Sequence, residues 1–335
     1  MIKLYVLSTF SFGISRDLLR SSSYSYALRN ERLFELPIWK VISRVFPTLT
    51  RTVLAPYYFC LLIDIYFRKS THLLIIRGEF VPVWFVEISR LILPNIKIVG
   101  YTWDSRKNNP RFYVLEKLMD KRYTFDLSDS LRYSIPHLPL FYFNSHNQIQ
   151  SRKESEITKI AFFGTVHSER LDWIKLLVKL SNRMNFEFDY HLFVRSKTEF
   201  HLLSQKNKSD GLRLSTESLS FKELSFRLDA ADIIIDIAHP SQSGLTLRTF
   251  EALSRGKLLI TNNKVICKYN LEMSDNIFVA ELDSLESCLS FVLNSPHSPS
   301  EVSEVLIGLE SGLWLNNLVN MEESELDWRE KHVRV

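Results

Sequence analysis

The segment SQSGLTLR, residues 241–248, combines hydroxyls, a glycine and an arginine in a pattern suited to binding phosphate groups. It follows an apolar run, ADIIIDIA, that is typical of a buried strand, and a helical pattern comes after it. Gly244 permits a tight turn, Ser243 and Thr246 offer hydroxyls, and Thr246 can cap the helix. The amides and dipole at a helix start attract a diphosphate, and Arg248 in the first turn can bind phosphate oxygens through two N–H groups. This pattern favours recognition of a phosphorylated ligand.

An acidic residue accompanies this pattern. Glu251 lies three residues after Arg248, on about the same face of the expected helix. A carboxylate beside bound phosphate is costly unless it has another task, and accepting hydrogen bonds from the hydroxyls of a ribose or a sugar is such a task. The alternative is a capped helix with an Arg–Glu pair at its surface, which requires no ligand.

Two further carboxylates follow apolar runs in the first half of the chain. Glu79 comes after LLIIRG, and Asp104 comes after IVGYTW. Ligands of open parallel sheets bind beyond the carboxyl ends of the strands, so a carboxylate here could take a proton from a hydroxyl group. We favour Asp104 for this role, with Glu79 as the second candidate, while Arg77 could pair with Glu79 or contact an anionic ligand. The alternative for Asp104 is a turn or a helix cap before SRKNNP.

Strand-like and helix-like segments alternate along the chain in two groups, separated by the polar segment 146–156. This alternation predicts an α/β fold of parallel sheets with crossover helices, arranged as two Rossmann-like domains facing a cleft. A terminal helix near residues 313–319 could pack back on the first domain. The expected strands are 3–9, 72–78, 96–104, 121–129, 157–164, 188–194, 232–238, 257–263 and 276–282, and the main helices of the second group are 168–184, 220–231, 246–256 and 284–295.

Composition excludes several classes of protein. The 335 residues, 45% of them hydrophobic and 24% charged, suit two globular domains. The three cysteines lie far apart, at no spacing typical of a metal site or a disulfide framework, which favours a reducing compartment. Neither GxGxxG nor GxxxxGK[ST] occurs, so dinucleotide and P-loop sites have no support. The first residues are more typical of a strand than of a signal peptide.

Charge and hydropathy bear on a membrane contact. The apolar run 53–67 is too short to span a bilayer and predicts a mostly buried helix. Arg51, Arg68 and Lys69 flank it, so the alternative is a helix that lies on a membrane surface. Residues 1–150 hold 20 Lys and Arg against 11 Asp and Glu, and the remainder holds 22 against 27. The basic half could face anionic lipid or an anionic acceptor, or be a solvated surface. Nucleic acid is not expected, because no binding motif accompanies the charge.

The run GLTLRTFEALSRGKLLITNN resembles the donor-binding strand, loop and helix of GT-B glycosyltransferases, especially bacterial enzymes of capsule, exopolysaccharide and O-antigen synthesis. The segments YTWDSRKNNP and FFGTVHSERLDW are also similar to segments of such proteins, and the resemblance covers most of residues 73–263. The E-x7-E motif of retaining enzymes is not intact, because Ser243 stands where its first Glu would be. The residues expected to bind the donor are Gly164, His167, Arg170, Arg195, Gln242, Ser243, Gly244, Thr246, Arg248 and Glu251.

The resemblance implies a cytoplasmic glycosyltransferase that moves a sugar from a nucleotide-activated donor to a lipid-linked or polysaccharide acceptor, for surface polysaccharides such as capsule or lipopolysaccharide. Residues 1–145 would bind the acceptor, residues 157–335 the nucleotide sugar, and the basic half could contact the anionic inner face of the plasma membrane. No metal or other cofactor is expected, since helix dipoles and arginines can neutralise a leaving diphosphate. The alternatives are a nucleotide-sugar epimerase of the same architecture and a non-catalytic polysaccharide-binding or assembly protein.

Overall fold

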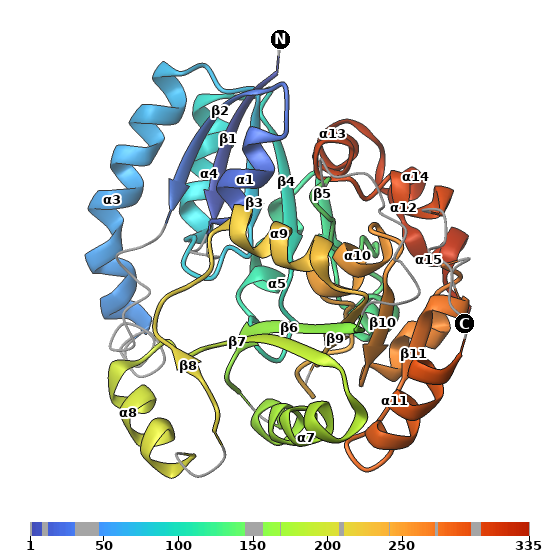
Figure 1. The fold of residues 1–335 in the computed structure, drawn as a ribbon. Helices are drawn as coiled ribbons and strands as arrows, with labels where there is room; N and C mark the ends of the chain where they lie inside the picture. Colours follow the sequence, from blue (N-terminus) through green and yellow to red (C-terminus); the bar gives the residue numbers. More distant parts are fainter. Residues whose placement is uncertain are drawn as a thin grey trace. The chain divides into compact units, whose positions relative to one another are not determined.

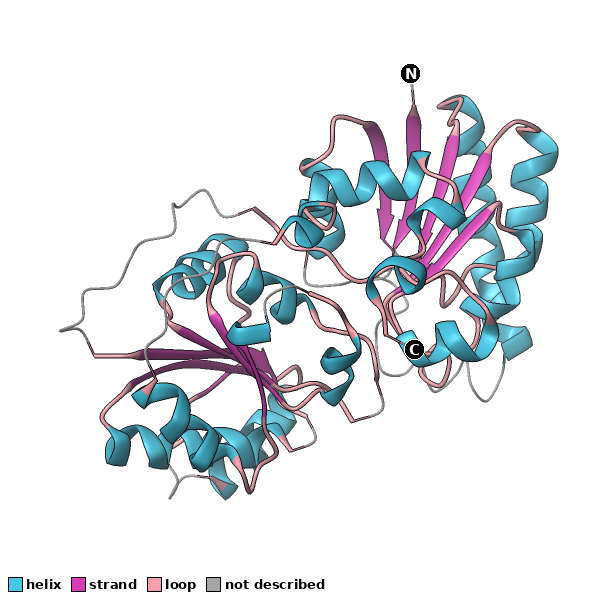
Figure 2. Cartoon of the chain, turned by 90° about the vertical axis from the view of Figure 1, so that its right-hand side faces the viewer, coloured by secondary structure: helices cyan, strands magenta, loops and turns pink. Residues whose placement is uncertain are grey.

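The computed structural model describes residues 2–8, 13–30, 47–144, 157–167, 169–207, 211–240, 242–271, 274–295 and 303–334. The chain divides into two compact units. The first comprises Met1–Leu140, Gln242–Gly244 and Gly308–Arg334, and the second comprises Phe141–Ser241 and Leu245–Ile307. Each unit has one parallel β-sheet with helices packed on it (Figures 1 and 2). The prediction of two parallel-sheet α/β domains is confirmed, and the linker expected at 146–156 lies outside the described residues.

The sheet of the first unit has the strand order β2-β1-β3-β4-β5, and all its neighbouring strands are parallel. Its strands are apolar along most of their length because helices cover the sheet, as parallel sheets require. The chain turns to opposite sides after β1, since β2 lies on one side of it and β3 on the other. The strands are β1 (Lys3–Ser8), β2 (Ser25–Asn30), β3 (His72–Ile76), β4 (Lys97–Thr102) and β5 (Lys121–Thr124).

The helices of the first unit come from both ends of the chain. Helices α3 (Pro47–Phe67) and α4 (Val83–Ile92) contact each other, and α1 (Ile14–Arg20) contacts α13 (Ser311–Asn320). The indole Nε1 of Trp314 on α13 donates to Pro139 O at 2.9 Å, which anchors the C-terminal segment. The shorter helices are α5 (Phe112–Leu115), α6 (Leu127–Tyr133), α14 (Glu323–Leu326) and α15 (Trp328–His332), with a 3₁₀ turn η2 (Glu116–Leu118).

Two expectations for the first unit were wrong in part. The strand expected at 121–129 ends at Thr124, because the Asp126 side chain accepts a hydrogen bond from Asp129 N at 3.0 Å and begins α6. The helix expected to be mostly buried around 53–67 is buried on one face only. Among the described helices, α3 included, none is long and apolar enough to cross a membrane.

The sheet of the second unit has the strand order β11-β10-β9-β6-β7-β8, again parallel throughout. The chain starts in the middle of this sheet at β6, adds β7 and β8 on one side, and then returns to add β9, β10 and β11 on the other. The strands are β6 (Lys159–Thr165), β7 (Glu187–Phe193), β8 (Leu214–Ser215), β9 (Ile233–Asp236), β10 (Leu258–Thr261) and β11 (Ile277–Val279).

Helices of the second unit begin at recognisable caps. Ser220 and Glu223 form a capping box at the start of α9 (Phe221–Ala230), and the Ser196 hydroxyl accepts from Glu199 N at the start of α8 (Lys197–Lys206). Ser168, which belongs to the expected helix 168–184, lies outside the described residues, and the helix itself, α7, runs from Arg170 to Met184. The remaining helices are α10 (Leu247–Leu253), α11 (Leu285–Asn294) and α12 (Glu304–Ile307), with 3₁₀ turns η4 (Lys264–Lys268) and η5 (Ser274–Asn276).

Candidate functional site

Arg170 lies where the strand order of the second sheet reverses, between β6 and β9. In open α/β sheets, this position at the carboxyl ends of the strands is where ligands bind. The Arg170 guanidinium donates from Nη1 to Thr165 O at 2.9 Å, and from Nε and Nη2 to Ile237 O at 2.9 and 2.6 Å. It therefore ties the two diverging strand ends together. Burial lowers the pKa of Arg170 to about 10, so the side chain is still cationic at neutral pH.

Gly164 makes room for this guanidinium. A Cβ at Gly164 would lie 2.9 Å from Cζ of Phe162 and 3.1 Å from Nη1 of Arg170. The Arg170 guanidinium carbon also lies 5.7 Å from the centre of the Phe162 ring, within the range of a cation–π contact. The glycine at the end of β6 is therefore explained by the packing of Arg170. Its expected contact with a donor remains a prediction.

Thr246 caps α10, as the sequence predicted. Its hydroxyl accepts from Arg248 N at 3.0 Å and Thr249 N at 3.4 Å, and it donates to Oδ2 of Asp236 at 2.7 Å. The Thr249 hydroxyl donates to the same Asp236 oxygen at 2.8 Å, and Asp236 is 3% exposed. No sequence pattern predicted a role for Asp236, which is the last residue of β9. The backbone amides of Arg248 and Thr249, at the start of α10, thus already donate to Thr246. The side chains of Arg170 and Arg248 are therefore better candidates for binding a diphosphate.

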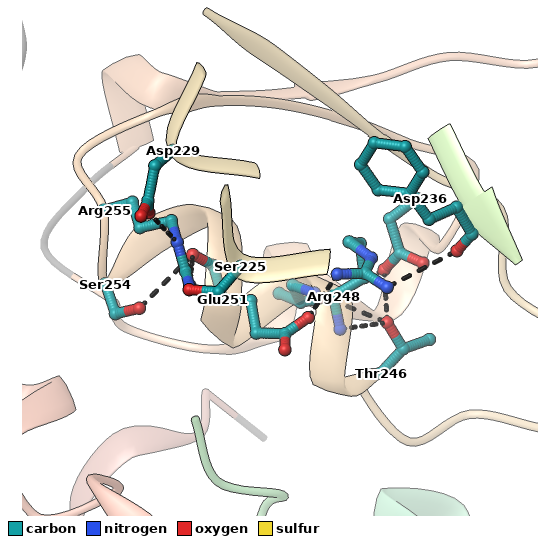
Figure 3. Close-up of polar contacts among 10 residues, drawn as sticks. Ser225, Asp229, Asp236, Thr246, Arg248, Glu251, Ser254 and Arg255 are labelled. Atoms are coloured by element: carbon teal, nitrogen blue, oxygen red, sulfur yellow. Dashed lines mark hydrogen bonds and ion pairs between the residues drawn. The ribbon is translucent and has the colours of Figure 1, made fainter. Parts of the chain in front are cut away.

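Arg248 and Glu251 form an ion pair across one turn of α10 (Figure 3). The capped helix and the Arg–Glu pair of the alternative are both present, but its surface position is wrong, because the two side chains are only 15% and 7% exposed. The Nη2 of Arg248 lies 3.4 Å from Phe163 O, and its Nε has no hydrogen-bond partner among the described residues. Arg248 therefore has a donor group that no described residue uses.

A second buried arginine supports the helix that carries Glu251, and the sequence analysis missed it. Arg255 is 4% exposed and donates to Asp229 Oδ1 at 2.8 Å, Ser225 Oγ at 3.1 Å and Glu251 O at 3.0 Å (Figure 3). It thereby joins α9 to α10. No local sequence signal predicts this, because its side-chain partners Asp229 and Ser225 lie 26 and 30 residues earlier in the chain.

His167 lies beside Arg170 and next to a second histidine, His239. The rings of His167 and His239 have centres 5.1 Å apart. Burial, and then the charges of Arg170 and His239, lower the pKa of His167 to about 4, so its ring is neutral at pH 7. Arg195, also expected to bind the donor, lies exposed on the turn between β7 and α8, at the carboxyl edge of the same sheet.

The carboxylates chosen as candidate bases share one arginine in the first unit. Arg77 follows β3 with a φ of 70°, a left-handed conformation that non-glycine residues rarely adopt. Its Nε lies 2.5 Å from Oδ2 of Asp104, and its Nη2 lies 3.4 Å from Oε2 of Glu79. Neither the Arg77 Nε nor this Asp104 oxygen makes a well-aligned hydrogen bond, so the contact is an ion pair. Asn109 fixes the unusual backbone by donating to Arg77 O at 2.6 Å.

The expected donor loop is divided, because Gln242–Gly244 belong to the first unit. Ser243 donates to Asp126 from its amide at 2.9 Å and from its hydroxyl at 2.6 Å, and Gln242 Nε2 lies 3.5 Å from Oδ1 of Asp104. A Cβ at Gly244 would lie 2.4 Å from the Phe125 ring, so this glycine permits close packing. These three residues thus contact Asp104, Asp126 and Phe125 of the first unit. Thr246, Arg248 and Glu251 lie with Arg170 in the second unit.

Metal ligands do not cluster in the described ranges: no three His, Cys, Asp or Glu side chains there lie close enough together to hold an ion.

No protein-family model matches the chain, and no curated protein matches it in sequence. Solved structures do match it over nearly the whole length. The chain has the GT-B fold. The apo form of the lipopolysaccharide outer core galactosyltransferase WaaB matches with a TM-score of 0.54 at 10% identity, covering 95% of this chain and 99% of WaaB.

Two other matches are structures that contain UDP or a UDP-sugar. The S. aureus MnaA structure with UDP has a TM-score of 0.57 at 10% identity, covering 96% of this chain and 95% of MnaA. The UDP-GlcNAc 2-epimerase of Methanocaldococcus jannaschii, in complex with UDP-GlcNAc and UDP, has a TM-score of 0.54 at 11% identity, covering 96% of this chain and all of that one. At such identities the likeness shows the fold, so an assignment of the reaction depends on the site residues.

Proposed function

We propose that this protein is a glycosyltransferase that moves a sugar from a nucleotide-activated donor to a lipid-linked or polysaccharide acceptor. The observation that carries the proposal is the cluster of Arg170, Arg248 and Glu251 at the point where the second sheet reverses its strand order. Two guanidinium groups there suit the diphosphate of the donor, and Glu251 suits the hydroxyls of its ribose. The Nε of Arg248 is buried and has no hydrogen-bond partner among the described residues, which supports a role in binding.

The reaction would use a carboxylate of the first unit as its base. The acceptor hydroxyl oxygen forms a bond to the anomeric carbon of the donor sugar while the bond from that carbon to the phosphate oxygen breaks. Asp104 takes the hydroxyl proton, with Glu79 as the second candidate, and the nucleoside diphosphate leaves with its charge balanced by Arg170 and Arg248. A single displacement of this kind inverts the anomeric carbon. The sugar, the nucleotide and a role in capsule or lipopolysaccharide synthesis belong to the same proposal.

A thermal-shift screen over nucleoside diphosphates tests the donor site, because a ligand that binds only the folded state raises the melting temperature. At a hundredfold excess over Kd, such a ligand adds about 2.7 kcal/mol to the free energy of unfolding. We expect the wild type to shift and R248A to lose the shift. R183A is the matched control, since Arg183 pairs with Glu286 on the exposed part of α7. An equal shift in R248A would contradict the assignment.

R248A leaves Glu251 buried without its partner, so a second variant separates binding from folding. R248M/E251Q replaces both charges with side chains of similar size, a change that buried ion pairs often tolerate. We expect this variant to melt cooperatively near the wild-type temperature without ligand and to show no shift with any nucleoside diphosphate. A retained shift would show that the diphosphate does not depend on this pair.

The epimerase alternative is favoured by one observation, the likeness of this fold to the UDP-GlcNAc 2-epimerase of Methanocaldococcus jannaschii. An epimerase would convert the nucleotide sugar without any acceptor and would return it as its epimer. Proton NMR of the sugar nucleotide after incubation with the protein alone distinguishes the two reactions. We expect an unchanged donor, and formation of an epimer would replace the transferase proposal.

A further inference from the structure

The outer face of α3 is apolar although it is exposed. From residue 52 onward, every exposed side chain of α3 is uncharged. The large apolar members of this face are Val53, Phe59, Ile63, Tyr66 and Phe67, which are 50%, 54%, 58%, 52% and 77% exposed. Successive members are six, four, three and one residues apart, which at 3.6 residues per turn places all five on one side of the helix. The exposed face of a helix in a globular protein is usually polar, and contiguous apolar patches mark interaction surfaces.

The opposite face of α3 fills the core of the first unit, so both faces of the helix are apolar. Tyr58 and Ile65 are fully buried, and Leu54 is 2% exposed. Asp64 is held in ion pairs with Arg29 at 2.5 Å and Arg68 at 2.8 Å, so it presents no free acid beside the apolar face. The helix forms the outer edge of this unit in Figure 1. The inner face of α3 is covered by the core of its own unit, so the outer apolar face is the part left to contact a membrane surface.

A cationic cavity lies at the carboxyl end of the same helix. It has a volume of about 260 Å³, and its lining includes Lys3 and Arg68 together with the hydroxyl residues Ser25 and Ser70. No acidic side chain of the described residues lines it. Arg68 directly follows Phe67, and the exposed Lys69 comes next. The apolar face of α3 therefore ends beside Lys3, Arg68 and Lys69, of which Arg68 also pairs with Asp64, and the cavity there has room for a phosphate.

We propose that α3 is the membrane-docking element of this protein: its outer face lies in the interface of an anionic bilayer, and the cavity at its end receives the phosphate of a lipid headgroup. The inference deepens the proposed function, on which it rests, because a lipid-linked acceptor is found in such a bilayer. Charge complementarity favours anionic lipid over a second copy of the chain. A dimer would cover the apolar side chains without supplying anions for Lys3 and Lys69, whereas Arg68 already pairs with Asp64.

Vesicle sedimentation with the full chain tests this inference. We expect binding to vesicles of phosphatidylcholine mixed with an equal share of phosphatidylglycerol, weaker binding in high salt, and little binding to phosphatidylcholine alone. The variant I63S/F67S should bind the anionic vesicles on the order of tenfold more weakly. F226S is the matched control, because Phe226 on α9 of the other unit is 71% exposed, and it should bind like the wild type.

Equal vesicle binding by I63S/F67S and wild type would overturn the proposal, as would equal binding to neutral and anionic vesicles. A wild-type dimer in light scattering that I63S/F67S converts to a monomer would instead identify a second copy as the occupant of this face. The nucleoside diphosphate shift of I63S/F67S should equal that of the wild type. If the wild type does not bind anionic vesicles but its melting temperature rises with a nucleoside diphosphate, only this inference is removed. If the melting temperature does not rise, the proposed function is removed.

Discussion

At the scale of single residues, the proposed donor site depends on the hydrogen bonds of Arg170 and Arg248. Arg170 uses three of its nitrogen atoms on the carbonyls of Thr165 and Ile237, so much of its hydrogen-bonding capacity is structural. Arg248 keeps a buried Nε without a partner among the described residues. An unsatisfied buried donor is costly, which makes it a candidate for contact with a ligand. Arg248 is therefore the residue whose replacement should affect donor binding most directly.

His167 offers a probe of the same place. Its pKa lies at about 4, below the usual 6.5, because burial and then the charges of Arg170 and His239 disfavour the protonated ring. A diphosphate bound at Arg170 and Arg248 adds negative charge nearby and should raise this pKa. We expect the ring NMR signals of His167, assigned with H167Q, to titrate at higher pH when UDP is present. An unchanged titration at saturating UDP would place the diphosphate elsewhere.

At the scale of elements, α10 is held by hydrogen bonds to the strand before it. Thr249 and Thr246 both donate to Asp236, which is nearly fully buried. T249V keeps the shape of the side chain but removes one donor from this carboxylate, so it should destabilise the second unit by about 1–3 kcal/mol. T249S retains the hydroxyl and should cost less. Urea unfolding of the two variants measures the difference, and equal stabilities would show that the bond to Asp236 contributes little.

Many of the strands and helices could be predicted from the sequence. The strands around 72–78, 157–164 and 257–263 were recognisable because buried parallel strands are continuously apolar and end at turn residues. Boundaries set by side-chain capping were harder, as at Asp126, where a polar residue ends one element and begins the next. The alternative of a surface pair for Arg248 and Glu251 was wrong about their exposure, because the spacing of residues does not show what packs over a helix.

At the scale of the whole molecule, the contacts that sequence could not reveal join distant parts of the chain. Trp314 donates to Pro139 across 175 residues, and Trp328 N donates to His137 O at 2.8 Å, so the C-terminal segment completes the first unit. Gln242–Gly244 likewise belong to that unit although their chain neighbours do not. No local pattern encodes such partners. The carboxyl-edge position of Asp104 followed from the strand pattern, whereas Arg170 was proposed from the resemblance to GT-B glycosyltransferases.

The central claim is that this molecule transfers a sugar rather than isomerising one. The most direct test incubates the wild type, R248A and R183A with a panel of nucleotide sugars and lipid-linked saccharides, and separates the products by chromatography. The account predicts that the wild type and R183A release nucleoside diphosphate in step with glycosylated acceptor, and that R248A releases far less. An epimerised nucleotide sugar with no diphosphate released, or equal release by R248A and the wild type, would contradict it.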